Sequence, residues 1–214
     1  MSTAAHLSEL PLFPLGTVLF PGGLLPLRIF EVRYLDLISR CHKSGSAFGV
    51  VSLTQGAEVR SAPSAGPQAL ETFSSVGTLA RITQYSAPQA GLLVIRCEGA
   101  ERFTVQRSEK LRHGLWVAEA ELLAPDHIVP IPEDLQHIAQ GLRKLLKQLK
   151  ERDVPADQMP LIEPYRFEDC DWVANRWCEL LPVPVEMKQQ LMSLDNPLLR
   201  LELVSDLLDK SGWS

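Results

Sequence analysis

The segment from Leu10 to Leu27 is mostly apolar, yet proline and glycine interrupt it every few positions. Between Leu10 and Leu27 the interruptions are Pro11, Pro14, Gly16, Pro21, Gly22, Gly23 and Pro26. Proline has no backbone N–H and its φ is fixed, so neither a regular helix nor a long central strand can run through this segment. We therefore predict a short buried strand framed by fixed turns.

A helical pattern follows directly. Apolar side chains recur at helical spacing at Phe30, Tyr34, Leu37, Ile38 and Cys41, which predicts an amphipathic helix. The opening segment is thus interpreted as strand, rigid turn and helix.

Short β-prone runs separated by turn residues continue to about residue 124. They are Ala47–Leu53, Gly77–Tyr85, Leu92–Glu98, Glu101–Gln106 and Leu115–Leu123. Ser86–Gly91 predicts a hairpin turn, Glu98–Glu101 predicts a second tight connection, and Ser61–Gln68 predicts a surface loop. Closely spaced short strands favour a barrel-like β domain.

The pattern becomes helical after Pro125. We predict helices at about 132–152, 170–181, 185–193 and 197–211, the last capped by Asp195 or Asn196 with Pro197 in its first turn. A basic run from Arg143 to Arg152 ends the first of them. A solvated helix end is the simpler interpretation of this run, and attraction of an acidic partner is the alternative.

Several motifs resemble, in order, the N-terminal substrate-recognition domain of Lon protease, which also occurs as a stand-alone protein. They are Leu12-Phe13-Pro14-Leu15, Val18–Gly22, Leu25–Leu27, Ile29–Tyr34, Phe48–Val51, Val76–Ile82, Gly99–Phe103 and Trp177–Leu201. The resemblance covers nearly the whole chain. It implies an α+β fold in which a PUA-like β-barrel domain with one helix (1–124) precedes a C-terminal α-helical bundle (125–214).

Composition narrows the function classes. The formal net charge of −5 offers no broad positive field for a phosphate backbone, which disfavours nucleic-acid binding. No segment reaches the ~20 apolar residues of a membrane span and no signal-peptide pattern opens the chain, so we expect a cytoplasmic protein without membrane contact. Cys41, Cys97, Cys170 and Cys178 are widely spaced, as expected of buried free thiols.

The sequence lacks the motifs of common enzymes. There is no phosphate-binding Gly-x-x-x-x-Gly-Lys-Ser/Thr loop, no Gly-x-Ser-x-Gly elbow and no His-Glu-x-x-His helix. The resemblance likewise implies neither the ATPase nor the Ser-Lys protease activity of complete Lon. We expect no catalytic residue, no cofactor and no metal site.

We therefore predict a non-catalytic module that engages exposed apolar segments of unfolded or flexible polypeptides, in partnership with a protease or alone. Exposed aromatic and apolar side chains, rimmed by arginine, would form its groove. The candidate binding residues are Phe20, Pro21, Leu25, Arg28, Phe30, Arg33, Tyr34 and Trp116. Arg28 and Arg33, with Glu31, have an alternative structural role, which is to fix the start of the helix to the β domain.

Two other functions stay open. PUA-like folds of other families bind RNA, which here would require a local surface of arginines such as Arg81, Arg96, Arg102 and Arg107. An enzyme with an unrecognised site between the two domains is the third possibility.

Overall fold

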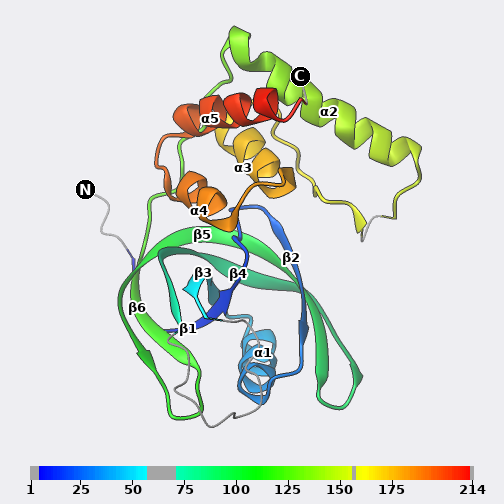
Figure 1. Ribbon diagram of the computed structural model, residues 1–214. Coiled ribbons are helices and arrows are strands. Elements are labelled where there is room, and N and C mark those ends of the chain that lie inside the picture. Colours follow the sequence, from blue (N-terminus) through cyan, green and yellow to red (C-terminus); the bar gives the residue numbers. More distant parts are fainter. Residues whose placement is uncertain (1–4, 57–70, 156–157, 213–214) are drawn as a thin grey trace. The chain divides into compact units, whose positions relative to one another are not determined.

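The computed structural model describes residues 5–56, 71–155 and 158–212. The chain has a mixed α+β fold and divides into two compact units, Met1–Pro125 and Asp126–Ser214 (Figure 1). The loop predicted at Ser61–Gln68 lies outside the described residues.

A six-stranded sheet forms the first unit. Its strands are β1 (His6–Leu15), β2 (Leu24–Ile29), β3 (Phe48–Gln55), β4 (Thr72–Gln89), β5 (Leu92–Lys110) and β6 (Trp116–Leu122). The order is β2-β5-β4-β3-β1-β6, and β6 pairs with β5 as well. Only the β1–β3 pair is parallel among the described pairings. Strands β5, β4, β3, β1 and β6 therefore form a closed set of hydrogen-bonded neighbours, because β6 pairs back with β5. Strand β2 pairs with β5 outside this set and lies at an edge of the sheet.

β4 and β5 are longer than the sequence predicts. The hairpin between them is confirmed, because Gln89 pairs with Leu92 across a tight turn. The second tight connection, predicted at Glu98–Glu101, is wrong, because β5 runs through it without a break. Within this part of β5, Gly99 lies close to the backbone of Phe20. A Cβ at position 99 would be 2.1 Å from the carbonyl oxygen of Phe20.

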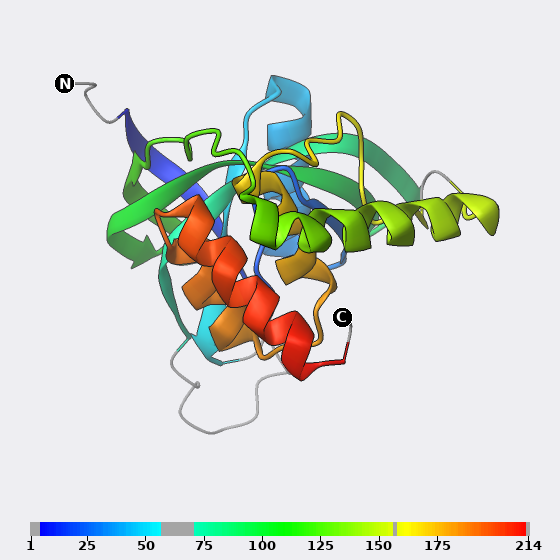
Figure 2. The same ribbon diagram turned by 90° about the horizontal axis from the view of Figure 1, so that it is seen from above.

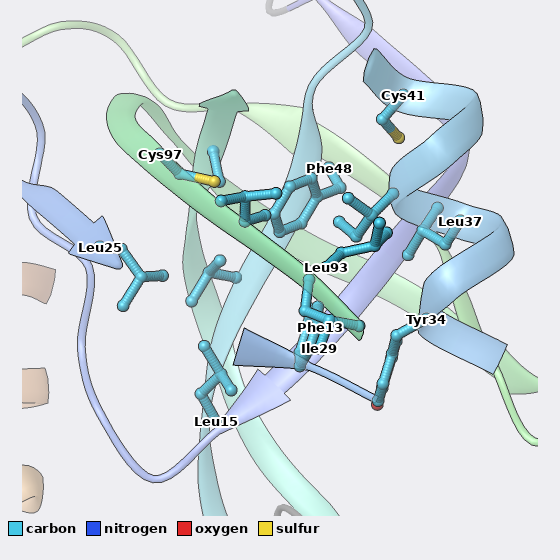
Figure 3. Close-up of a cluster of buried hydrophobic side chains, with 14 of the residues drawn as sticks. Phe13, Leu15, Leu25, Ile29, Tyr34, Leu37, Cys41, Phe48, Leu93 and Cys97 are labelled. Atoms are coloured by element: carbon cyan, nitrogen blue, oxygen red, sulfur yellow. The ribbon is translucent and has the colours of Figure 1, made fainter. Parts of the chain in front are cut away.

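Helix α1 (Val32–Ser44) covers one face of this unit and closes its main apolar cluster (Figure 3). Figure 3 shows Tyr34, Leu37 and Cys41 of α1 pointing toward side chains of the strands. The Tyr34 ring stacks on Phe13 of β1 with centroids 3.9 Å apart. Phe30 does not belong to the helical stripe as predicted, because α1 begins two residues later and leaves this side chain 54% exposed.

The second unit is helical in the part that the structure describes. A 3₁₀ turn, η1 (Glu133–Leu135), leads into α2 (Gln136–Glu151), and α3 (Cys170–Leu180), α4 (Val185–Ser193) and α5 (Pro197–Lys210) follow. Helix α3 contacts α2, α4 and α5 (Figure 1 and Figure 2), and its residues 170–178 are all buried. The predicted cap is confirmed at Asn196, whose side chain accepts a hydrogen bond from the Leu199 N–H.

A buried arginine joins three helices of this unit. Arg200 of α5 is 1% exposed, and its Nη1 donates to Oδ1 of Asp171 at 2.6 Å and to Oδ2 of Asp126 at 2.8 Å. Its Nε donates to the carbonyl of Leu191 in α4 at 2.9 Å. Burial, together with the neighbouring Asp126, raises the pKa of Asp171 to about 6. Arg166 adds a second cation, with its Nη2 3.8 Å from Oδ2 of Asp171. The two carboxylates are largely shielded from water and depend on these arginines for their charge compensation.

No helix within the described residues is both long enough and apolar enough to cross a membrane.

Candidate functional site

Strand β2 presents an open edge. It pairs antiparallel with β5, with Leu25 opposite Cys97 and Ile29 opposite Leu93. In the described part of the chain no strand pairs with its other side, which we call the β2 edge. Such an edge carries unpaired N–H and C=O groups that can accept one more extended chain. Pro26 lies within this strand, as is typical of edge strands.

Exposed apolar side chains lie on β2, directly after it and on its partner strand β5. Leu25 and Ile29 point into the buried cluster, whereas the alternate positions Pro26 and Arg28 are exposed. Beyond them, Phe30 is 54% exposed and Val32 is 74% exposed. Val94 lies opposite Arg28 in the pairing register and is also exposed. We call Pro26, Phe30, Val32 and Val94 the apolar strip.

Backbone hydrogen bonds fix the start of β2. The N–H of Gly22 donates to the Gly99 carbonyl at 2.7 Å, and the Gly99 N–H donates to the Gly23 carbonyl at 2.9 Å. The turn is closed by a bond from the Gly23 N–H to the Phe20 carbonyl at 2.9 Å. The turn Phe20–Gly23 therefore holds the start of β2 against the middle of β5.

Arg33 fixes the other end. Its Nε donates to Oε2 of Glu31 at 3.0 Å and its Nη1 donates to the carbonyl of Gly114 at 2.8 Å. The guanidinium also lies 4.5 Å from the centre of the Tyr34 ring. These bonds confirm the predicted structural role of Glu31 and Arg33, whereas Arg28 is exposed.

Glu71 connects Arg33 to Trp116. Its Oε2 accepts hydrogen bonds from Lys110 Nζ at 2.7 Å and from Trp116 Nε1 at 2.9 Å, and its Oε1 lies 4.0 Å from Arg33 Nη1. Burial acts to raise the pKa of Glu71, but the hydrogen bonds from Lys110 and Trp116 and the two cations lower it overall. The ionised carboxylate thus joins α1, β5 and β6.

A shallow groove of about 610 Å³ continues from the apolar strip along the outer face of α1. It is lined by Val32, Arg33, Asp36, Ser39, Arg40, Lys43 and His113. The groove is apolar where it meets Val32 and mainly basic farther along the helix, because Arg40 and Lys43 lie at that end.

The structure separates the eight candidate binding residues into two groups. Exposed or half-buried are Pro21, Arg28, Phe30 and Trp116, whereas Phe20, Leu25, Arg33 and Tyr34 are buried. The buried four support the surface from below, and a binding role for the others stays a prediction. Sequence reasoning missed Val32, Val94 and Glu71. The exposure of Val32 could have been predicted from the sequence, because this residue is apolar but lies outside the helical stripe.

The thiols of this unit are poor nucleophiles. Burial raises the pKa of Cys97 to about 12 and also raises the pKa of Cys41. The His42 ring beside Cys41 stacks on Tyr85 with centroids 4.1 Å apart. Across the described residues, no group of three or more His, Cys, Asp or Glu side chains is placed to hold a metal ion.

The family follows from a comparison over nearly the full length. A family model described as the ATP-dependent protease La (LON) substrate-binding domain matches residues 9–210. The chain belongs to this family. In the LON proteases this domain binds substrate and is non-catalytic. The motifs in the opening strand, turn and helix therefore identified the family correctly.

Similar proteins agree with this assignment. The Lon protease of Anaeromyxobacter dehalogenans is 28% identical over 94% of this chain, and Lon protease 2 of Myxococcus xanthus is 26% identical over 94%. The chain spans 23% of the length of each. A Lon N-terminal domain protein from Xanthomonas campestris is 31% identical with a TM-score of 0.68, covering 94% of this chain and 98% of that one. The N-terminal domain of the Mycobacterium avium complex Lon protease, 16% identical with a TM-score of 0.56 over 94% and 98% of the two chains, shares the fold.

Proposed function

We propose that this chain is a non-catalytic polypeptide-binding module that holds exposed apolar segments of other polypeptides along the β2 edge. The single observation that carries the proposal is the exposure of Phe30 and Val32 at the end of an edge strand, in a chain of a substrate-binding family. An extended segment would hydrogen-bond to the β2 backbone and place alternate side chains on the apolar strip.

The architecture supports this role. The return of hydrogen bonding from β6 to β5 supports a PUA-like β-barrel for unit 1, and the contacts of α3 with three helices support a helical bundle for unit 2. Such a barrel would keep β2 rigid while its outer side stays open. The four free cysteines support a reducing, cytoplasmic location. Delivery of bound segments to a separate protease belongs to the same proposal and is motivated by the Lon relatives.

Exposed area sets the expected size of the effect. A phenylalanine side chain carries roughly 200 Å², so 54% exposure leaves about 110 Å² to bury on binding. At about 25 cal/mol per Å² this corresponds to at most about 2.7 kcal/mol. Part of it is offset by the ordering of the bound segment, so loss of Phe30 and Val32 together should weaken binding at least about tenfold.

The test is fluorescence anisotropy with a labelled 12-residue peptide of Leu, Phe, Ser and Gly, which carries no charged side chain. We expect the F30S/V32S double variant to bind at least tenfold more weakly than the parent chain. The matched control is I128S, because Ile128 is 75% exposed but lies in the other unit, and its affinity should stay within twofold. The proposal fails if the parent binds nothing at high micromolar concentration, or if F30S/V32S and I128S behave alike.

RNA binding is less well supported. Arg102 is 5% exposed, and Arg81 donates to both carboxylate oxygens of Glu101 at 3.0 and 2.9 Å. These two arginines are therefore poorly placed to contact phosphates.

A further inference from the structure

The groove on the outer face of α1 begins where the β2 edge ends. Strand β2 ends at Ile29 and α1 begins at Val32, so the strand passes almost directly into the helix (Figure 1). Val32 belongs both to the apolar strip and to the lining of this groove of about 610 Å³. Exposed residues recur along one stripe of the helix, at positions 32, 36, 40 and 43. A segment bound at the β2 edge can therefore extend along α1.

The far end of the groove carries an excess of positive charge. Arg40 and Lys43 are exposed, and neither forms an ion pair in the parts of the chain that the structure describes. Asp36 is the only carboxylate among the described lining residues. The third cation of the lining, Arg33, is already paired with Glu31. Two unpaired cations thus face one unpaired carboxylate.

The β2 edge adds one more cation. Arg28 is exposed on β2, and its guanidinium forms no ion pair within the described residues. In the pairing register it lies opposite Val94 of the apolar strip. Cations therefore lie beside the apolar strip on both the strand and the helix, in a chain whose formal net charge is −5. A local cationic site in an acidic protein attracts anionic partners selectively.

We propose that the segments held at the β2 edge have two parts, an apolar stretch and, beside it, acidic residues that enter the α1 groove. This inference rests on the proposed function of the β2 edge and names the chemistry of its ligands. The apolar stretch covers the apolar strip, and carboxylates next to it pair with Arg40 and Lys43.

The spacing of the groove sets the spacing of the ligand. Val32 and Arg40 are eight positions apart, about 12 Å along the helix. An extended segment spans this distance with about four residues. A polypeptide can place uncharged side chains opposite Val32 and Asp36, whereas a nucleic acid carries a charge at every nucleotide. The groove therefore fits a polypeptide better than a nucleic acid.

The test is fluorescence anisotropy on the full chain with two labelled peptides. One is the uncharged peptide of Leu, Phe, Ser and Gly described above. The other is the same peptide with a Ser-Gly-Ser spacer and Glu-Asp-Glu added at each end. We expect the parent chain to bind the acidic peptide about fivefold more tightly at about 0.1 M salt, as two surface ion pairs predict. This preference should disappear at about 1 M salt.

Three variants locate the preference. R40Q/K43Q should bind the two peptides alike, because both unpaired cations of the groove are removed. K144Q/K210Q is the matched control: it removes two exposed lysines of unit 2, one of them in the last turn of a helix as Lys43 is, and it should keep the preference of the parent chain. D36N removes the carboxylate of the lining and should enlarge the preference about twofold. Thermal unfolding verifies that each variant retains the fold.

The outcomes separate this inference from the proposed function. Equal affinity of the parent chain for the two peptides would overturn the inference alone, whereas binding of neither peptide at high micromolar concentration would overturn both. Loss of the preference in K144Q/K210Q would mean that net charge attracts the acidic peptide without a defined site. Unchanged binding of the acidic peptide by F30S/V32S would show that the groove acts apart from the β2 edge. Tighter binding of a single-stranded RNA of similar length, lost in R40Q/K43Q, would identify a nucleic-acid surface instead.

Discussion

Replacement of Gly99 by alanine should destabilise unit 1 more than an ordinary glycine substitution. The added Cβ would lie 2.1 Å from the Phe20 carbonyl oxygen and 3.0 Å from its carbonyl carbon, both of which belong to the backbone. Real Cβ atoms essentially never come within 3.0 Å of another heavy atom, so the turn Phe20–Gly23 must move by roughly 1 Å. Such a shift stretches the hydrogen bonds that Gly99 exchanges with Gly22 and Gly23.

The magnitude follows from these two effects. Each weakened buried hydrogen bond costs about 1 kcal/mol, and overpacking adds about 1–3 kcal/mol. Alanine also restricts the unfolded chain more than glycine does, which offsets somewhat less than about 1 kcal/mol of this loss. We therefore expect the free energy of unfolding of unit 1 to fall by about 3 kcal/mol. With a urea m-value of about 2 kcal/mol/M, the unfolding midpoint should move down by about 1.5 M.

Urea unfolding read by pulsed hydrogen exchange and mass spectrometry of β4 and β5 peptides measures unit 1 separately from unit 2. G45A is the matched control. Gly45 ends α1 with φ +68°, and a Cβ added there would have no neighbour within 4 Å, so its substitution costs only the left-handed backbone strain, about 1 kcal/mol. If G99A lowers the midpoint no more than G45A, the close approach of Phe20 does not govern this site and the reasoning is refuted.

Three further predictions concern ionisable and sulfur groups. Burial raises the pKa of Asp171 to about 6 and that of Glu179 to about 7. The folded state therefore binds these two protons more tightly than the unfolded chain does. The free energy of unfolding should fall as pH rises from about 4 to 7, by up to about 3 kcal/mol per group. Urea titrations at several pH values should show that the free energy of unfolding depends less on pH in D171N than in the parent chain. An unchanged pH dependence in D171N would contradict this. R33M keeps the aliphatic stem but removes two hydrogen bonds, so calorimetry should find a loss of about 2 kcal/mol; an unchanged melting temperature would argue against the anchor. Burial raises the pKa of Cys97 and of Cys178 to about 12, so iodoacetamide at pH 8 should label both thiols only after denaturation.

The helices of unit 2 were predictable because their signals are local. Asn196 followed by Pro197 gives a cap and a first turn within neighbouring residues, and the structure begins α5 there. The helix predicted at 185–193 likewise coincides with α4, which directly follows Pro182 and Pro184 in the sequence. In α2, the buried residues Ile138, Leu142 and Leu146 recur at helical spacing, a pattern that can be read without reference to any other part of the chain.

The candidate site was predictable only in part. The opening motif led to Phe30 and Arg33, but the helical spacing assigned Phe30 to a buried stripe, and the structure leaves it exposed. Whether a side chain beside a strand is exposed depends on the pairing register and on which strand lies at the edge. Val94 was therefore missed, because its position opposite Arg28 exists only once β2 and β5 are paired.

By itself the sequence determined the family, the α+β class, a last helix capped by Asp195 or Asn196 and the proline-fixed opening turn, since motifs, caps and turns depend on residues close together in the chain. Only the tertiary structure decided that β2 is an edge, that Gly99 admits the Phe20 carbonyl, and that Arg33 bonds to Gly114, a residue 81 positions away. The hydrogen bond between Glu71 and Trp116 likewise could not be predicted from local sequence, because the two residues are 45 positions apart. Such contacts depend on how distant segments pack, and no local periodicity encodes them.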